Sequence, residues 1–208
     1  MSRILAVNYP EAPQMAAEVL RSGALIVLPT DTVYGVASLL DEASIGRIFA
    51  AKKRPADRAI PVLLADQSAV LQVVSEFSEP ARRLAEAFWP GPLTMALPKR
   101  DDLPPNLSTL PTVGVRVPGY APSRAIIAAA GGALAVTSAN RSDQPPACTI
   151  QACIRYLSDT VALYLDGGTC PGGVPSTVIA FEGGDLRIMR QGPISEAALR
   201  AALGLEHG

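Results

Sequence analysis

Apolar and polar residues along the chain follow two spacings that alternate from one segment to the next. Apolar residues three and four positions apart predict helices between Met15 and Gly23 and at 42–52, 67–74, 79–89, 123–130, 150–157 and 196–203. Short apolar or alternating runs predict strands at 24–28, 60–65, 93–97, 113–117, 134–137, 161–165, 177–181 and 186–189. Strands that alternate with helices in this way predict an α/β protein with a mixed sheet and helices packed on it.

Several boundaries are marked by single residues. Pro29 ends the first strand, Asp41 is a good N-cap for the helix at 42–52, and Pro55 limits that helix because the residue before a proline is pushed toward extended geometry. The segment 99–111 is the longest predicted loop. A chain of 208 residues with 49% hydrophobic residues can bury a sizeable core. We therefore expect one domain over 1–208, with its motifs in a core at 24–192.

The length of the apolar segments indicates where in the cell the protein is expected. The longest, 125–136, has 12 residues and is shorter than the roughly 20 that span a bilayer, and the first residues lack the apolar core of a signal peptide. We expect a cytoplasmic protein without a membrane partner. The three cysteines, Cys148, Cys153 and Cys170, form no CxxC pair, so we interpret them as thiols that pack in the fold.

Charge and histidine content exclude several kinds of chemistry. The net charge of −1 predicts no general attraction to polyanions. The only histidine is His207, next to last in the chain and expected to fray, which argues against a Ser-His-Asp or Cys-His hydrolase and against a zinc site. The sequence has neither GxxxxGK[ST] nor GxGxxG. Chemistry must therefore rest on Arg, Lys, hydroxyls, carboxylates and backbone amides, and we predict no metal ligands.

Polar residues follow the first strand in the motif PTDTVYG, at 29–35. An extended backbone would send Thr30, Thr32 and Tyr34 to one side and Asp31 to the other. Three hydroxyls on one side could line a pocket. The alternative is a strand end followed by ordinary turn residues.

A basic window follows the second helix. Residues 47–58 hold five basic side chains against Asp57, a local charge of +4. Cations at a helix C-terminus explain part of this excess, but Arg54 and Arg58 lie beyond the helix. If the chain is extended from Lys52 to Arg54, the two side chains point the same way and form a clamp for phosphates.

Further polar residues end other predicted strands. In LAVTSAN, at 134–140, Ser138 and Asn140 would face one side, although an Asn turn after a strand is common. Arg116 in VGVRVP and Arg190 in RIMRQG each follow a strand-like run, and the plain interpretation of Arg116 is a solvent-facing strand position. WPGPLT, at 89–94, is typical of a structural turn anchored by Trp89.

Taken in order, PTDTVYG, KKRP, WPGPLT, VGVRVP, TSAN, STVI and RQG resemble the YrdC/TsaC family of threonylcarbamoyl-AMP synthases. The similarity spans 29–192. It implies a single α/β domain with a large twisted mixed sheet, surrounding helices and a concave basic cavity. It also implies that the protein condenses L-threonine, bicarbonate and ATP to threonylcarbamoyl-AMP and pyrophosphate, with Mg²⁺ accompanying the nucleotide. The partners would be downstream tRNA threonylcarbamoyl-transfer proteins, with at most weak binding of tRNA itself.

The resemblance also implies roles for individual residues. Lys52, Arg54, Ser138 and Asn140 match the family's catalytic Lys-x-Arg and Ser-x-Asn pairs. Thr32, Arg116 and Ser176 would contact threonine, with Arg116 on its carboxylate. Arg54, Arg58, Ser138, Asn140 and Arg190 would bind the nucleotide. Apart from the resemblance, we consider Asp31 as a residue that could reach a metal through water.

The chain departs from the family pattern at Leu63, where some relatives have histidine, and at Asp143, where glycine is frequent. Two alternatives stay open. One is an RNA-binding module of the same fold, which only ten aromatic residues support poorly. The other is a paralogue that carbamoylates or adenylates a different small substrate.

Overall fold

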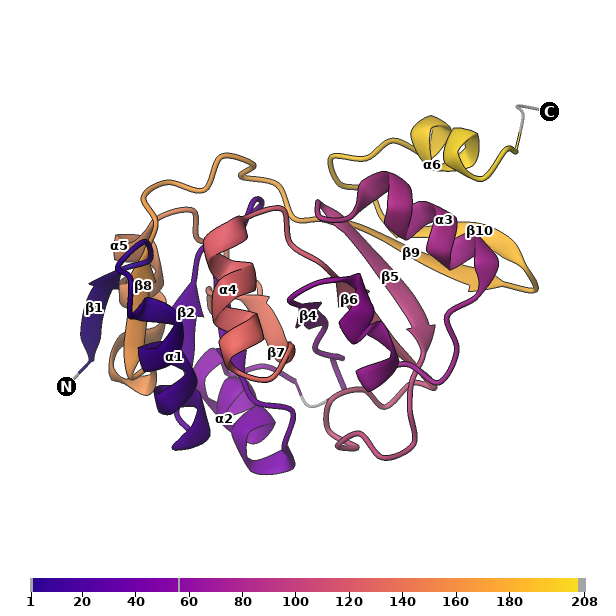
Figure 1. Ribbon diagram of the computed structural model, residues 1–208. Coiled ribbons are helices and arrows are strands. Elements are labelled where there is room, and N and C mark those ends of the chain that lie inside the picture. Colours follow the sequence, from indigo (N-terminus) through magenta and orange to yellow (C-terminus); the bar gives the residue numbers. More distant parts are fainter. Residues whose placement is uncertain (1, 56, 206–208) are drawn as a thin grey trace.

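A computed structural model, which describes residues 2–55 and 57–205, has ten strands in one continuous sheet (Figure 1). The strands are β1 (Arg3–Ala6), β2 (Ile26–Leu28), β3 (Gly35–Ser38), β4 (Val62–Leu64), β5 (Leu93–Pro98), β6 (Thr112–Arg116), β7 (Ala133–Ser138), β8 (Leu163–Asp166), β9 (Thr177–Glu182) and β10 (Asp185–Arg190). Their order is β1-β8-β2-β3-β7-β4-β6-β5-β9-β10, with parallel and antiparallel pairs. The predicted mixed sheet is confirmed.

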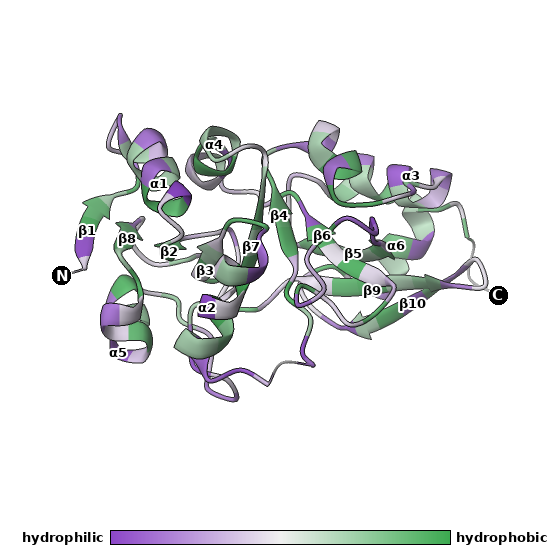
Figure 2. Ribbon diagram, turned by 90° about the horizontal axis from the view of Figure 1, so that it is seen from below, coloured by the Kyte–Doolittle hydropathy of each residue, from purple (hydrophilic) through white to green (hydrophobic). Residues whose placement is uncertain are grey.

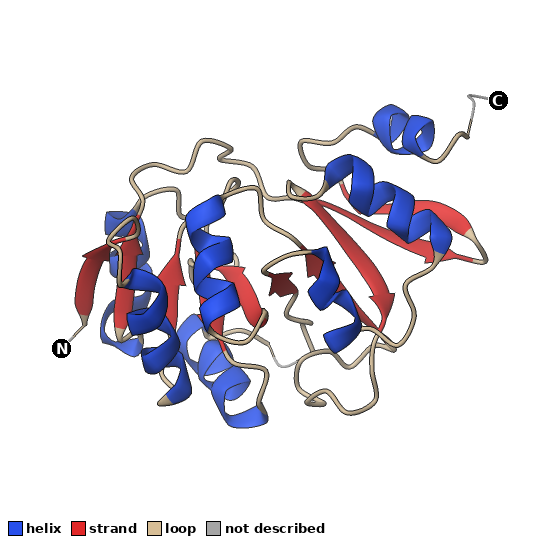
Figure 3. Cartoon of the chain, viewed as in Figure 1, coloured by secondary structure: helices blue, strands red, loops and turns tan. Residues whose placement is uncertain are grey.

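Helices lie on both sides of this sheet (Figure 3). They are α1 (Ala12–Arg21), α2 (Glu42–Lys52), α3 (Glu79–Phe88), α4 (Ala121–Ala129), α5 (Ile150–Leu157) and α6 (Glu196–Ala202), with short 3₁₀ helices η1 (Gln67–Gln72) and η2 (Ser158–Thr160). The predicted N-cap of α2 is confirmed, because the Asp41 carboxylate accepts a 2.8 Å hydrogen bond from the Ser44 amide. Within residues 2–55 and 57–205, no helix is long and apolar enough to cross a membrane.

Two strands, β1 and β3, were not predicted from the sequence. Each has only four residues. All four residues of β3 are buried, so they show no alternation of polar and apolar positions. β1 pairs in parallel with β8, which is distant in the sequence. β3 pairs with the nearby β2 on one side and with the distant β7 on the other. Partners distant in the sequence therefore help to form both strands, and local spacing does not reveal them.

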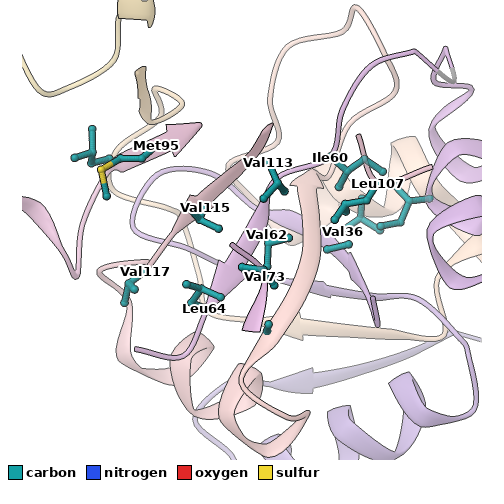
Figure 4. Packing of buried hydrophobic residues seen from close by; sticks show 14 of the residues in the cluster. Val36, Ile60, Val62, Leu64, Val73, Met95, Leu107, Val113, Val115 and Val117 are labelled. Atoms are coloured by element: carbon teal, nitrogen blue, oxygen red, sulfur yellow. The ribbon is translucent and has the colours of Figure 1, made fainter. Parts of the chain in front are cut away.

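The hydrophobic core has two parts, one on each face of the sheet. On one face, side chains of β4, β5 and β6 such as Val62, Met95 and Val115 pack together (Figure 4) under α2, α3, α5 and α6. On the other face, α1 and α4 cover the half of the sheet that runs β1-β8-β2-β3-β7-β4. Figure 2 shows the hydrophobic colouring concentrated on the strands and on the helix sides turned to them. The functional cavity lies on the second face.

Candidate active site

A cavity of about 490 Å³ lies beside α4, mainly over strands β6, β5, β9 and β10. This volume is within the range of roughly 300–1,000 Å³ that is usual for small-molecule sites. Its lining residues come from most of the chain: Thr30, Thr32, Val33, Tyr34, Gly35, Ala59, Pro61, Leu63, Thr94, Ala96, Leu110, Thr112, Gly114, Arg116, Val136, Thr137, Ser138, Pro175, Ser176, Val178, Ala180, Phe181, Glu182, Met189 and Arg190.

One row of side chains across the sheet forms the polar end of the cavity. Val178 of β9 pairs with Thr94 of β5 on one side and with Arg190 of β10 on the other. Arg116 follows the pairing of Val115 with Met95, which places it beside Thr94. Two arginines and a hydroxyl thus face the same space from neighbouring strands.

The next row across the sheet consists of small residues. Ala96 pairs with Gly114 on one side and with Ala180 on the other, and all three line the cavity. Leu110 and Met189 also belong to the lining, and both are more than half exposed. Small side chains on the floor and larger apolar ones near the opening leave room for a ligand.

Arg116 is the most constrained charged group of the cavity. Its side chain is buried, although the alternation of its strand suggested a solvent-facing position. Nε donates to the Gly91 carbonyl at 2.9 Å, and the two terminal nitrogens donate to Thr32 Oγ1 at 3.0 Å and Asp31 Oδ1 at 2.5 Å. Burial lowers the pKa of Arg116, and the neighbouring Asp31 carboxylate raises it. Gly91 belongs to WPGPLT, so this motif has a role beyond its turn: its backbone holds the side chain of Arg116.

The PTDTVYG segment bends after Pro29, as in the alternative of a strand end followed by turn residues, and is not extended throughout. Thr30 Oγ1 accepts the amides of Thr32 and Val33 and lies 2.9 Å from Thr32 Oγ1. These two hydroxyls line the cavity together. The hydroxyl of Tyr34 instead donates to the Gly168 carbonyl at 2.7 Å, and burial raises the pKa of this phenol. The prediction of three hydroxyls on one side is therefore wrong for Tyr34.

Ser176 connects Thr94 with Arg190. Its hydroxyl lies 2.8 Å from Thr94 Oγ1, and Arg190 donates to the Ser176 carbonyl at 2.9 Å and 3.1 Å. Thr94 was not predicted as a site residue, because WPGPLT was interpreted as structural. A hydroxyl at the start of a strand gives no local signal of a partner 82 positions away.

A connection from β8 to β9, residues 167–176, runs across the top of the molecule in Figure 1. We call this segment the strap. It contacts PTDTVYG closely, because Gly173 donates to the Thr32 carbonyl at 3.0 Å. A Cβ atom at Gly172 would lie 2.7 Å from the Asp31 carbonyl oxygen, so this approach requires glycine. The strap thus delivers Ser176 to the cavity and fixes the threonine turn.

Lys52 ends α2 with a side chain that is only 1% exposed. Its ammonium donates to the carbonyls of Ser138 and Asn140. Burial, with a smaller effect of Arg54, lowers the pKa of Lys52 to about 7. Lys53 adopts the left-handed conformation (φ 49°) and turns the chain, so Lys52 and Arg54 do not lie along an extended backbone. The geometry assumed for the predicted clamp is therefore wrong.

The other cations of the basic window spread in different directions. Arg54 donates to the carbonyls of Arg58 and Ala59, at 3.2 Å and 2.8 Å. Arg58 forms an exposed ion pair with Asp143 at 3.1 Å, and Arg47 donates to the Gly23 carbonyl. Burial lowers the pKa of Arg54. Arg54 and Arg58 thus lie near the loop that follows Ser138, while Arg47 belongs to another surface.

Ser138 and Asn140 differ in their surroundings. Ser138 lines the cavity at the end of β7. Asn140 is buried, and its Nδ2 donates to the carbonyls of Arg141 and Gln144 at 2.8 Å and 2.7 Å. Its Oδ1 is buried without a hydrogen-bond partner. The loop after β7 is therefore held from the inside by Asn140 and Lys52.

The structure brings five of the predicted site residues together on the cavity lining: Thr32, Arg116, Ser138, Ser176 and Arg190. Lys52, Arg54, Arg58 and Asn140 are not part of that lining, and His207 lies outside the described residues. The charged lining residues are two arginines and Glu182. The concave cavity exists, whereas its basic character stays a prediction.

Metal and thiol chemistry have limited support in the residues that the structure describes. No group of three or more His, Cys, Asp or Glu side chains within 2–55 and 57–205 could hold a metal ion. The Asp31 carboxylate, which we considered as an indirect ligand, already accepts from Arg116. Burial raises the pKa of Cys153 to about 12 and that of Cys170 to about 11, so both stay protonated at neutral pH.

Sequence comparisons match most of the chain. The profile of the Sua5/YciO/YrdC family, described as "Telomere recombination", matches residues 18–192. Threonylcarbamoyl-AMP synthase of Bacillus subtilis is 34% identical over 98% of this chain and 59% of its own length. The protein of the same name from Pyrococcus abyssi is 34% identical over 92% of this chain and 57% of its length. The chain thus spans less than two thirds of these two relatives.

Two solved structures have a fold similar to that of this chain. Sua5 of P. abyssi complexed with L-threonine has a TM-score of 0.92 and 32% identity, over 98% of this chain and 61% of that one. YciO of Escherichia coli has a TM-score of 0.86 over 96% of this chain and all of the other, but at 24% identity it supports the fold alone.

Proposed function

We propose, because this chain belongs to the Sua5/YciO/YrdC family, that it makes threonylcarbamoyl-AMP from L-threonine, bicarbonate and ATP. The reaction is a nucleotidyl transfer that releases pyrophosphate. Its product would be consumed in the cytoplasm by proteins that transfer the threonylcarbamoyl group to tRNA. Relatives that are threonylcarbamoyl-AMP synthases support this proposal, although two of them are much longer than the present chain.

The observation that carries the proposal is a buried arginine among hydroxyls at one end of the cavity. Arg116 uses three of its five N–H groups within the protein and keeps two on its terminal nitrogens. Two N–H groups on an arginine suit a carboxylate. The hydroxyls of Thr32 and Ser176 lie in the same lining and can hydrogen-bond the hydroxyl of an amino acid. This combination fits threonine, which is the ligand in the P. abyssi Sua5 structure.

The proposed chemistry does not need a strong side-chain base. The threonine amine and bicarbonate give an N-carboxylate with loss of water, and its anionic oxygen attacks the α-phosphorus of ATP. The bond from that phosphorus to the β-phosphate oxygen breaks, and pyrophosphate leaves. Because the nucleophile is already an anion, positioning and charge stabilisation are the main requirements. A chain with one histidine, at position 207, can meet them.

We assign the nucleotide to the part of the site around Ser138 and Arg190. Ser138 and Arg190 line the cavity and would contact the nucleotide directly. Arg54 and Arg58 lie near the loop after β7, and they would reach the phosphates from the same side as that loop. Lys52 and Asn140 would hold that loop in place from inside, with the Lys52 charge behind Ser138. Together these cations would offset the charge that moves to pyrophosphate.

Mg²⁺ would enter with ATP. The described residues offer no cluster that could bind it alone, and Mg²⁺ in such sites is often held mostly by phosphates and water. The ion would neutralise phosphate charge. Arg54 and Arg190 would then orient the nucleotide, while the buried surroundings of Arg116 keep water away from the threonine end.

The test is pyrophosphate release with threonine and bicarbonate omitted in turn. We expect release only when both are present with ATP. Arg116→Gln should raise the KM for threonine far more than the KM for ATP. Equal release without threonine would instead indicate a plain ATPase or a paralogue with another substrate. Mass spectrometry of the product distinguishes those two outcomes.

A further inference from the structure

Asp31 contacts the proposed carboxylate site from the side away from the ligand. Its carboxylate accepts from Arg116 at 2.5 Å, with the two side chains 20% and 6% exposed, but Asp31 itself is not part of the cavity lining. It therefore acts on a ligand only through Arg116. A buried ion pair of this kind adds little to stability, because the desolvation of both groups offsets much of their attraction. A functional role would explain why it is present.

The space for Asp31 is built into the fold. A Cβ atom at Gly119 would lie 3.2 Å from the Asp31 carboxylate, and one at Gly172 would lie 2.7 Å from its backbone oxygen. The connection from β6 to α4 and the strap therefore both approach this residue closely. Asp31 has a defined place against Arg116, with little room for a longer side chain.

Charge at this end of the cavity is nearly balanced. Arg116 contributes one positive charge, and Arg190, which we assign to the nucleotide, lies between the two ends of the site and adds a second one, close enough to lower the pKa of Arg116. Asp31 cancels one of them, so three charged groups leave a net charge of +1. Without Asp31 the same site would hold +2. A ligand with one carboxylate matches the observed charge, and a ligand with two would match the site without Asp31.

We propose that Asp31 is a specificity-determining residue that restricts the amino-acid end of the cavity to substrates with a single carboxylate. This inference rests on the proposed function, since it takes threonine as the ligand of Arg116. Asp31 acts through Arg116: it offsets part of the guanidinium charge that a second carboxylate would meet, and it positions the guanidinium. Its role differs from that of Thr32 and Ser176, which would recognise the substrate hydroxyl.

The experiment combines a pair of ligands with a pair of proteins. L-aspartate and L-asparagine have similar shape and differ by one charge, and each is used as an inhibitor of threonine-dependent pyrophosphate release. Asp31→Asn removes the protein charge but keeps an oxygen that can accept from Arg116. Asp102→Asn is the matched control, because Asp102 forms an exposed ion pair with Arg100 at 2.6 Å.

We expect L-aspartate to inhibit the natural protein no better than L-asparagine does, despite the two arginines. Asp31→Asn should improve inhibition by L-aspartate about ten-fold or more relative to L-asparagine, since one unit charge within a partly buried site is worth at least that. The change at Asp102 should leave the ratio of the two inhibition constants unaltered. A residue with only a structural role would weaken both ligands alike.

Three results would overturn the inference. The first is strong preference of the natural protein for L-aspartate, which needs no variant and holds even if Asp31→Asn fails to fold. The second is an unchanged inhibition ratio in a folded Asp31→Asn protein that still releases pyrophosphate with threonine. The third is a natural protein that does not use threonine, and only this result also refutes the proposed function.

Discussion

Arg54 lies outside the cavity lining, so its replacement tests whether the proposed phosphate site extends beyond that lining. Its guanidinium donates to two backbone carbonyls of the loop at 58–59. Lysine keeps the charge but cannot reproduce a planar fork. We expect Arg54→Lys to slow pyrophosphate release by about 30- to 1,000-fold, or roughly 2 to 4 kcal/mol of transition-state stabilisation. Steady-state kinetics of the folded variant measure this, and near-normal rates would return Arg54 to an ordinary surface role.

Lys52 gives a prediction about pH. With a folded pKa of about 7 against 10.5 for the ordinary group, the unfolded chain binds more protons between these values. The free energy of unfolding should therefore rise with pH above about 7. Below about pH 7 both states are protonated at Lys52, so this residue adds no pH dependence. Relative to Lys52→Met, the natural protein should gain about 2 kcal/mol between pH 7 and pH 9. Urea unfolding at both pH values provides the measurement, and parallel changes in the two proteins would contradict the low pKa.

Thr32 and Ser176 should select substrates by the hydroxyl group. Valine has nearly the shape of threonine but places a methyl group against these hydroxyls where threonine would add a hydrogen bond, so it should fail as a substrate. Serine keeps the hydroxyl and loses one methyl group, which should reduce kcat/KM by roughly 10- to 200-fold. The comparison uses one pyrophosphate assay for all three amino acids. Better turnover of valine than of serine would show that the pocket recognises shape alone.

At the scale of elements, the strap is the segment whose packing matters most for the site. Gly172→Ala would place a methyl group against the backbone of Asp31 and Thr32. We expect the KM for threonine to rise several-fold, because Thr32 and Ser176 move, while the KM for ATP changes little.

Gly46→Ala is the matched control for this substitution. A Cβ atom there meets no heavy atom within 4 Å, and Gly46 lies inside α2. This variant should be stabilised by about 0.5 to 1 kcal/mol, with unchanged kinetics. If both variants behaved alike in the assay, the strap would have no special role.

At the scale of the whole molecule, the site lies on the part of the second face that helices leave uncovered. α1 and α4 cover one part of the second face, and the cavity lies beside them over β6, β5, β9 and β10. The net charge of −1 gives this surface no general attraction to nucleic acid.

The same charge leads to a prediction about RNA. Binding of tRNA should be weak and should fall steeply between 50 mM and 200 mM salt, because only local basic residues such as Arg54 and Arg58 could contact phosphates. A gel-shift titration at the two salt concentrations measures this. Tight binding that persists at the higher concentration would favour the RNA-binding module over the synthase.

The sequence by itself determined the helices, eight of the ten strands and the identity of the family. The helix at Glu42–Lys52 and its cap at Asp41 were predicted correctly, because cap and spacing are local signals. The ordered motifs predicted the Sua5/YciO/YrdC relationship, which the comparisons confirm. These features depend on residues only a few positions apart, or on residue identity alone.

Only the tertiary structure decided which of these residues meet. Arg116 looked solvent-facing on its strand, yet it is buried against Asp31, 85 positions away. Tyr34 turns toward Gly168, and the left-handed Lys53 separates the directions of Lys52 and Arg54. The physical reason is that alternation tells which residues share a face of a strand, but not what covers that face. Arg116 is covered by the PTDTVYG segment and by the turn at Gly91, and the strap holds PTDTVYG in place through contacts between distant parts of the chain.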